Sequence, residues 1–203
     1  MYVLHHHPYS QHARRVVALL DEVGLDYRLV PVSFDTGEYL SPAYRAINPN
    51  HQVPSFQDGS LRIHESNAIL RYLCNKHGLE DWYPSAPARR AEVDQWLDWN
   101  QCRLSPVVVD IVLNSLFAGP KADKAALARG KEKLPELAEI LAAALEVRPF
   151  VAGDRPTIAD LSLASNIFQL SLAKAAPLDG ATGDWFERMS RLEGVRRSLP
   201  AAA

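Results

Sequence analysis

The chain has 203 residues, of which 47% are hydrophobic and 23% charged. This composition is typical of a folded globular protein, and it excludes a mainly disordered chain, which needs low hydrophobicity and high net charge. The 22 Lys and Arg residues nearly balance the 24 Asp and Glu residues. The basic surplus typical of nucleic-acid-binding domains is therefore absent, and no nucleic-acid partner is expected.

Neither a membrane span nor a metal or disulfide framework is predicted. The most apolar stretch, Pro106 to Phe117, is interrupted by Asp110 and Asn114, whereas a span needs about 20 apolar residues. Cys74 and Cys102 lie far apart and form no CxxC pair, which disfavours a disulfide framework or a zinc site. The first residues lack the charged region and cleavage site of an export signal, so a cytoplasmic location is the default expectation.

Residues 1–80 are predicted to form an α/β domain. Strands are expected at residues 1–5, 27–34, 53–56 and 61–64, and helices at residues 11–23 and from residue 66 onward. The first helix carries apolar residues at helical spacing and is followed by Gly24, a common helix end. The Asp58-Gly59 pair is a strong signal for a hairpin between the last two strands.

Residues 86–203 are predicted to form a second, all-α domain after a linker that is rich in proline and small residues. Long periodic segments predict helices at residues 89–117, 124–145, 157–173 and 185–199, with a bend in the first at Pro106. The residues after 199 are expected to be a frayed tail.

Val53-Pro54 stands where a strand of the first domain is predicted to begin. Proline has no N–H to donate to a sheet, and a cis peptide bond would explain its presence there. Such a turn would leave the backbone N–H and C=O of Val53 facing outward, where an extended peptide could pair with them like an added strand. An ordinary edge-strand proline is the alternative.

Glu65 and Ser66 stand where the hairpin turns into the next helix. Ser66 suits the start of a helix, where free N–H groups and the helix dipole favour a carboxylate ligand. Glu65 beside it suits an ammonium group. Together the two residue types fit the α-amino and α-carboxylate groups of an amino acid, although Ser66 alone is also an ordinary helix cap.

Ser10 lies between the first strand and the first helix. Its hydroxyl can cap the helix, or it can donate a hydrogen bond to an anion at the positive end of the helix. A ligand thiol held there would have its pKa lowered from about 8.5. A serine nucleophile would need a general base, for which His12 is the only near candidate, and the G-x-S-x-G pattern of hydrolases is absent.

The run His5-His6-His7 is expected to belong to the end of the first strand. His5 and His7 share one face of a strand while His6 points to the other, and no acidic residue lies close in the sequence. A metal site is therefore not predicted.

Taken together, these motifs resemble the glutathione transferases over nearly the whole chain. The first domain carries Asn48-Pro49-x-x-Gln52-Val53-Pro54, the Asp58-Gly59 hairpin and Glu65-Ser66-x-Ala68-Ile69 in the order of that family. The second carries Phe150-Val151-Ala152-Gly153 followed by Pro156-Thr157-Ile158-Ala159-Asp160, in which Thr157 and Asp160 form a capping-box pair. The resemblance implies a thioredoxin-like α/β N-terminal domain plus an all-α helical C-terminal domain.

The resemblance also implies roles for individual residues. The segment from Ser10 to Val16 is similar to serine-type members such as the phi and theta classes, in which the serine hydrogen-bonds the glutathione sulfur. Tyr9 is the competing hydroxyl, and the absence of a cysteine at this position disfavours glutaredoxin-like reduction. Gln52 and Val53 would hold the cysteinyl part of glutathione, and the γ-glutamyl end would be held by Glu65 and Ser66.

The glycine end of glutathione is where this sequence departs from the family pattern. Phi-like members carry a His-Lys pair after Gly-Glu, whereas Gly37-Glu38 is followed here by Tyr39-Leu40. The family usually has glycine where this chain has His51. Tyr39 and His51 are accordingly included as candidate glutathione-binding residues, with His51 as a replacement for the missing cation or hydrogen bond.

The predicted activity is conjugation of the glutathione thiolate to a small hydrophobic electrophile, with glutathione as cosubstrate and a cytoplasmic homodimer active in detoxification as the implied form. The electrophile is expected against the long helix near Leu104, Val107, Val108 and Ile111. One alternative is a glutathione-dependent isomerase or dehalogenase, although the Ser-Ser-Cys run of the maleylacetoacetate isomerases is absent. The other is a non-catalytic ligand-binding or interaction module, which the departures at Tyr39, Leu40 and His51 favour.

Overall fold

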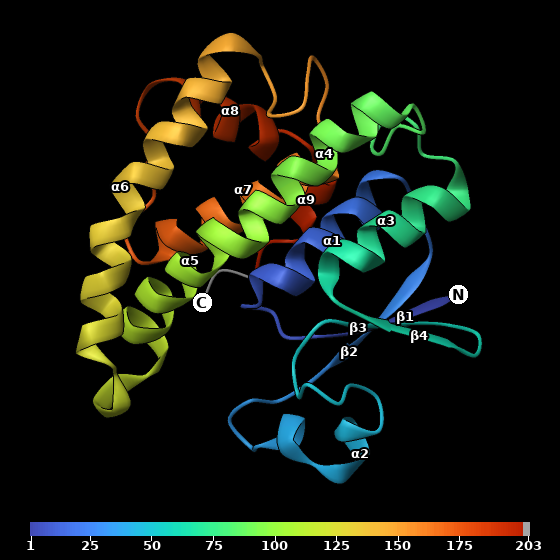
Figure 1. Cartoon of the computed structure of the whole chain (residues 1–203). Coiled ribbons are helices and arrows are strands. Elements are labelled where there is room, and N and C mark those ends of the chain that lie inside the picture. The colour runs from blue at the N-terminus through green and yellow to red at the C-terminus, as the bar shows by residue number, and fades with distance from the viewer. Residues whose placement is uncertain (201–203) are drawn as a thin grey trace. The chain divides into compact units, whose positions relative to one another are not determined.

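The computed structural model describes residues 1–200, so most of the predicted tail lies outside the described residues. The chain divides into two compact units, and Figure 1 shows their elements. The first unit contains Met1–Gly78 together with the residues from Arg191 onward, and the second contains Leu79–Ser190. The domain boundaries at residues 80 and 86 stay a prediction, because the contacts assign the last helix to the first unit.

A four-stranded sheet forms the centre of the first unit. Its strands are β1 (Tyr2–His6), β2 (Tyr27–Pro31), β3 (Ser55–Asp58) and β4 (Leu61–His64). They lie in the order β2-β1-β3-β4, with β1 parallel to β2 and β3 antiparallel to both of its neighbours. This mixed sheet confirms the predicted thioredoxin-like α/β fold.

Helices lie on both sides of the strands. α1 (Gln11–Glu22) packs against α3 (Ser66–His77), and the short α2 (Pro42–Arg45) lies on the other side of the strands, following a 3-10 turn at Glu38–Leu40 (Figure 1). The inner faces of α1 and α3 are fully buried, as their apolar spacing predicts. The completely buried residues are Val16, Leu19, Leu20, Ile69, Leu70 and Leu73, and each contributes about 1.5–3 kcal/mol by leaving water.

Two strands differ in extent from the prediction. The second strand ends at Pro31 and not at residue 34. The third begins at Ser55 and continues through Asp58, so the hairpin turn contains only Gly59 and Ser60. Of the two alternatives that the sequence leaves open for Pro54, the structure has the cis Val53–Pro54 peptide bond.

The second unit is helical, as predicted. Its long elements are α4 (Pro87–Trp99), α5 (Ser105–Val112), α6 (Lys124–Val147), α7 (Ile158–Leu172) and α8 (Gly180–Ser190). Two π-helical segments, Asn100–Leu104 and Leu113–Phe117, make residues 87–117 one continuous helix. In a regular α-helix the ring of Pro106 would clash with the carbonyl group of the residue four positions earlier. That residue lies in the first π-helical segment, where the helix is wider than an α-helix.

Asp160 is the main buried polar centre of the second unit. The predicted capping box is present, with Thr157 as N-cap of α7 and Asp160 as its reciprocal acceptor. The fully buried carboxylate accepts hydrogen bonds from Thr157 N (2.8 Å), Val151 N (3.0 Å) and Trp185 Nε1 (3.0 Å). Burial raises the pKa of Asp160, and these hydrogen bonds limit the rise.

A second buried network ties the π-helical turn to α7. Asn100 donates from Nδ2 to Ser162 Oγ over 2.9 Å and accepts at Oδ1 from Asn166 Nδ2 over 2.8 Å. All three side chains are buried. Satisfied polar networks of this kind fix one arrangement of neighbouring helices, because any shift leaves a buried amide without its partner.

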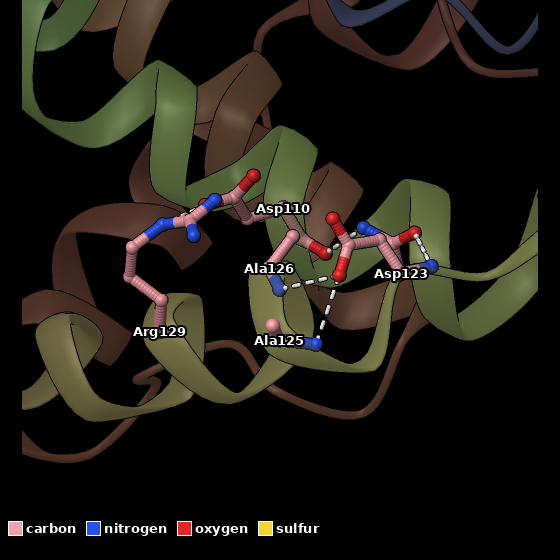
Figure 2. A network of polar contacts seen from close by, with 6 residues as sticks. Asp110, Asp123, Ala125, Ala126 and Arg129 are labelled. Carbon is pink, nitrogen blue, oxygen red and sulfur yellow. Dashed lines mark hydrogen bonds and ion pairs between the residues drawn. The ribbon is translucent and has the colours of Figure 1, made fainter.

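The junction between α5 and α6 is held at the surface by a polar network, shown in Figure 2. Asp123 caps α6 by accepting from Ala125 N (2.9 Å) and Ala126 N (3.0 Å). Its own N–H donates to Asn114 Oδ1 over 2.8 Å. Arg129 on α6 forms an ion pair with Asp110 on α5 at 3.1 Å. The cap and the ion pair fix the two helices close to each other at this end.

The C-terminal segment differs from the prediction of one helix at residues 185–199. It forms α8 and then the short α9 (Glu193–Arg197), with Leu192 extended between them. Gly194 packs so closely on α1 that a Cβ there would overlap the carbonyl oxygen of Ala18. Its N–H donates to Glu22 Oε2 over 2.7 Å. These contacts with α1 stabilise the break between α8 and α9 more than the hydrogen bonds of one continuous helix would stabilise the unbroken form.

Among residues 1–200, no helix combines the length and the apolar character needed to cross a membrane.

Replacement of Asp160 by alanine is expected to destabilise the protein by about 3 kcal/mol or more, because three or more buried donors lose their acceptor and each costs about 1–3 kcal/mol. The free energy of unfolding from urea denaturation measures this loss. Asp154→Ala is the matched control, since Asp154 is exposed and lies in the loop just before α7, and it should change stability by less than about 0.5 kcal/mol. Equal stability of the two variants would contradict the assigned role of Asp160.

Candidate functional site

The register of the sheet brings the predicted site residues to one end of the first unit. His5 of β1 pairs with Ser55 of β3, and Ser55 pairs in turn with His64 of β4. The chain leaves β1 toward residue 10, enters β3 from residue 53 and leaves β4 toward residue 65, all at this same end. Three segments far apart in the sequence therefore meet there.

Ser10 forms the N-cap of α1, with its Oγ accepting from Ala13 N over 3.2 Å. This is the ordinary capping role, and it leaves the hydroxyl hydrogen of Ser10 available to a ligand. Within residues 1–200, the backbone N–H groups of Gln11 and His12 make no hydrogen bond, as expected in the first turn of a helix. Together with the helix dipole, these donors make this end of α1 suitable for an anion.

Tyr9 lies one residue outside the helix and is 37% exposed. Its ring lies 6.2 Å from the ring of His7, centroid to centroid. Since Ser10 and not Tyr9 caps the helix, the geometry favours Ser10 as the hydroxyl nearest the free N–H groups.

Two polar side chains hold the turn that leads into Val53. Both Tyr44 Oη (2.8 Å) and Asn48 Nδ2 (2.7 Å) donate to the carbonyl oxygen of Gln52. In the described part of the chain, the N–H and C=O of Val53 itself form no hydrogen bond. The Gln52 side chain is exposed. The turn therefore presents one unpaired backbone donor and acceptor on a rigid support, as the sequence predicts for a site of peptide pairing.

Glu65 and Ser66 lie at the start of α3. Glu65 has a φ of 72°, a left-handed conformation that costs a non-glycine residue about 1–3 kcal/mol and is found most often at functional sites. Ser66 is 4% exposed and opens the helix, so its N–H lies outside the hydrogen bonds of α3. The prediction of Ser66 as the helix cap is wrong, because Glu65 is the N-cap and Ser66 is the first residue of α3.

The structure also brings Tyr39 and His51 together. His51 Nδ1 lies 3.0 Å from the carbonyl oxygen of Tyr39. A carbonyl oxygen only accepts, so Nδ1 carries the hydrogen and Nε2 remains for other partners. His51 also adopts a positive φ of 56°, a conformation that glycine adopts without strain. The contact with Tyr39 helps to hold the strained turn.

Arg14 and Arg15 are buried arginines of α1. Burial lowers the pKa of Arg14 to about 10 and that of Arg15 to about 9, so both remain charged at neutral pH. Arg15 Nη1 donates to Asn67 Oδ1 on α3 over 3.3 Å. Burial and the neighbouring Arg15 lower the pKa of His12 to about 3, so His12 is neutral.

The three histidines at the end of β1 and just after it are part of the fold. Burial lowers the pKa of all three, and they are neutral at pH 7. The ring of His7 stacks on Phe34 at 4.5 Å, and His5 meets the edge of Tyr44 at 6.0 Å.

The residues near which an electrophile is expected are buried. Leu104, Val107, Val108 and Ile111 are at most 9% exposed, as is usual for core residues. The exposed apolar residues of the same helix lie on another face and are Val109, Leu113, Leu116 and Phe117. The position of the electrophile stays a prediction.

Two residues that sequence reasoning missed support the site. Tyr44 and the side chain of Asn48 fix the turn before Val53. Asn48 belonged to a quoted motif, but its role as donor to Gln52 depends on the folded loop. Tyr44 carried no signal, because a single tyrosine in a short helix has no distinctive spacing.

Known proteins match this chain over nearly its whole length. The family model described as "Glutathione S-transferase, N-terminal domain" matches residues 4–81, and "Glutathione S-transferase, C-terminal domain" matches residues 124–197. A probable glutathione S-transferase of Oryza sativa subsp. japonica is 34% identical over 157 residues, which cover 75% of this chain and 73% of that protein. Glutathione S-transferase 4 of Zea mays is 36% identical over 156 residues, covering 75% and 70%.

Solved structures of glutathione transferases have a similar fold over nearly the whole chain. The glutathione transferase F2 of Populus trichocarpa superposes with a TM-score of 0.89 and 30% identity, covering 98% of this chain and 97% of its own. A theta-class glutathione S-transferase of Xanthomonas axonopodis pv. citri, solved with glutathione bound, has a TM-score of 0.87 and 29% identity and covers 99% and 98%.

Replacement of Tyr44 by phenylalanine is expected to lower the free energy of unfolding by about 1–2 kcal/mol, because the Gln52 carbonyl loses a buried donor. Chemical denaturation measures the change. Tyr39→Phe is the control, since no hydrogen bond of the Tyr39 hydroxyl is among those of the described residues, and it should be near neutral. If Tyr44→Phe leaves the free energy of unfolding unchanged, the hydroxyl does not support the turn.

Proposed function

The chain belongs to the glutathione S-transferase family, whose activity is the transfer of glutathione, and we propose that Ser10 holds the glutathione thiolate at the N-terminus of α1. The observation that carries this proposal is the meeting of Ser10, Val53 and Ser66 at one end of the sheet, which the strand register imposes. Glutathione is a peptide with a thiol, an α-amino group and two carboxylates. The three segments offer groups for the thiol, the cysteinyl backbone and the γ-glutamyl end, and the glycine carboxylate is proposed to meet His51.

The cysteinyl residue of glutathione is proposed to pair with Val53. The free N–H and C=O of Val53 supply the two hydrogen bonds of an antiparallel strand pair, and the exposed Gln52 side chain supplies a further polar contact. Because Tyr44 and Asn48 already hold the turn, little ordering is required when the peptide binds.

The γ-glutamyl end is proposed to lie at α3. Its α-carboxylate would accept hydrogen bonds from the N-terminal N–H and the hydroxyl of Ser66, where the helix dipole also favours negative charge. Its ammonium group would lie against the Glu65 carboxylate. Glu65 is the N-cap of α3 and adopts a φ of 72°.

The thiol is proposed to lie at α1. The Ser10 hydroxyl donates its hydrogen to the sulfur while its lone pair accepts from Ala13 N. The helix dipole stabilises the thiolate further, which lowers the thiol pKa. The thiolate then attacks the carbon of a small hydrophobic electrophile, a sulfur–carbon bond forms, and the leaving group departs with its electron pair. The thiol proton goes to solvent before the attack.

Three wider features are also proposed from family membership. They are a homodimer, a cytoplasmic location and a part in detoxification, and the mass of the native protein in solution tests the first.

Ser10→Ala is expected to raise the pKa of the bound thiol by about one unit and to slow conjugation of an activated aryl halide about tenfold below that pKa, since one unit is worth about 1.4 kcal/mol. Ser10→Ala also loses the helix cap, so Ser10→Asp is the companion variant. Aspartate caps a helix at least as well but adds a like charge beside the thiolate, and it should slow the reaction without loss of stability.

Ser10→Thr keeps both the cap and the donor and is expected to retain most of the rate. Wild-type rates in Ser10→Ala, or an equal loss in Tyr9→Phe, would assign the thiolate contact to another group.

His51→Ala is expected to weaken glutathione binding several-fold while leaving the affinity for γ-glutamylcysteine, which lacks the glycine, unchanged. The physical reason is that His51 Nε2 is the group proposed to meet the glycine carboxylate, while its Nδ1 holds the Tyr39 carbonyl. Calorimetric titration with both peptides measures the two affinities. Equal losses for the two peptides would mean that His51 acts on the turn as a whole and not on the glycine end.

A further inference from the structure

One buried hydrogen bond joins α1 to α3 close to the ends at which both helices begin. Arg15 Nη1 donates to Asn67 Oδ1 over 3.3 Å, although the two residues are 52 positions apart in the sequence. Arg15 is the fifth residue of α1, and Asn67 is the second residue of α3. Arg15 is completely buried and Asn67 is 8% exposed, so the bond lies inside the first unit.

This bond lies nearer to the two helix starts than the main apolar packing of the same helices does. The completely buried apolar side chains begin at Val16 in α1 and at Ile69 in α3. Apolar packing is non-directional, whereas a hydrogen bond needs its donor and acceptor at one distance and angle. If one helix start shifted relative to the other, the charged guanidinium of Arg15 would be buried without this acceptor, which is costly. The bond therefore fixes the position of one helix start relative to the other.

The two helix starts are the places proposed for the thiol and for the γ-glutamyl end of glutathione. Ser10 caps the helix that carries Arg15, and Ser66 is the neighbour of Asn67 in the chain. An α-helix rises about 1.5 Å per residue, so Arg15 lies only about 7.5 Å from Ser10 along the helix axis. Two helix starts at a fixed separation fit a ligand whose thiol and α-carboxylate lie at the matching distance.

We propose that Arg15 and Asn67 are positioning residues that select the length of the γ-glutamyl group. The inference rests on the proposed function, because it assigns the thiol to Ser10 and the α-carboxylate to Ser66. Neither Arg15 nor Asn67 contacts the peptide in this arrangement, and both act through the two serines. A peptide that carries the same charged groups on a chain one methylene shorter reaches only one helix start at hydrogen-bond distance. β-Aspartylcysteinylglycine is such a peptide.

Calorimetric titration of the full-length protein with glutathione and with β-aspartylcysteinylglycine tests this selection. The wild-type protein is expected to bind glutathione about tenfold or more tightly, since one methylene in a fitted site is worth about that factor. Asn67→Leu keeps the approximate size of the side chain but removes the acceptor, and it should lower the ratio of the two affinities about threefold or more. Arg15→Met removes the donor of the same bond and should lower the ratio by the same factor.

Two further variants separate the bond from a general loss of stability. Asn67→Asp keeps an acceptor for Arg15 and should retain the wild-type ratio, although its charge weakens both peptides by repelling their α-carboxylate. Asn75→Leu makes the same change at an exposed position of α3 and should leave both affinities unchanged. A partly unfolded variant binds less of both peptides but keeps the ratio of their affinities, so a merely structural role would not move this readout.

A wild-type ratio in Asn67→Leu or Arg15→Met, or a lowered ratio in Asn67→Asp or Asn75→Leu, would overturn the inference. Equal affinities of the wild-type protein for the two peptides would also overturn it, because the site would then select no length. Failure of the wild-type protein to bind glutathione at all would instead overturn the proposed function itself.

Discussion

The antiparallel pairing of β3 between β1 and β4 is the constraint on which the candidate site depends. It aligns the end of β1 with the start of β3 and the end of β4, so residues near positions 10, 53 and 65 meet without any direct bond between them. A shift of one residue in this register would turn Phe56, which is 1% exposed, out of the core. The hydrophobic core therefore fixes the geometry of the polar site, and the stability of the sheet and the position of the ligand groups are linked.

Buried polar groups with and without partners serve different purposes. In the second unit the carboxylate of Asp160 and the amide of Asn100 have their partners inside the protein, which fixes the arrangement of helices. In the first unit the backbone N–H and C=O of Val53 have no partner among the described residues. Satisfied groups specify a fold, whereas groups left unsatisfied on a rigid support are available to a ligand.

Much of the fold follows from the sequence, because its signals are local. Helical spacing in α1 and α3, the Asp58-Gly59 hairpin and the Thr157–Asp160 capping box each depend on residues a few positions apart. The break before α9 did not follow, because it depends on contact of Gly194 with α1 far away in the sequence. The same reason applies to the site. Ser10, Val53 and Glu65 were found from motifs, but the support from Tyr44 and the hydrogen bond between Arg15 and Asn67 exist only in the folded chain.

The packing of α9 on α1 has a consequence for the order in which the protein forms. A ribosome makes the chain from the N-terminus, so α1 is complete long before Gly194 is synthesised. The surface of α1 that receives this residue, with the Glu22 carboxylate at its edge, stays uncovered until Gly194 leaves the ribosome. The second unit, Leu79–Ser190, is by contrast fully synthesised before Gly194 is added. The first unit therefore completes its packing only after every residue of the second unit has been made.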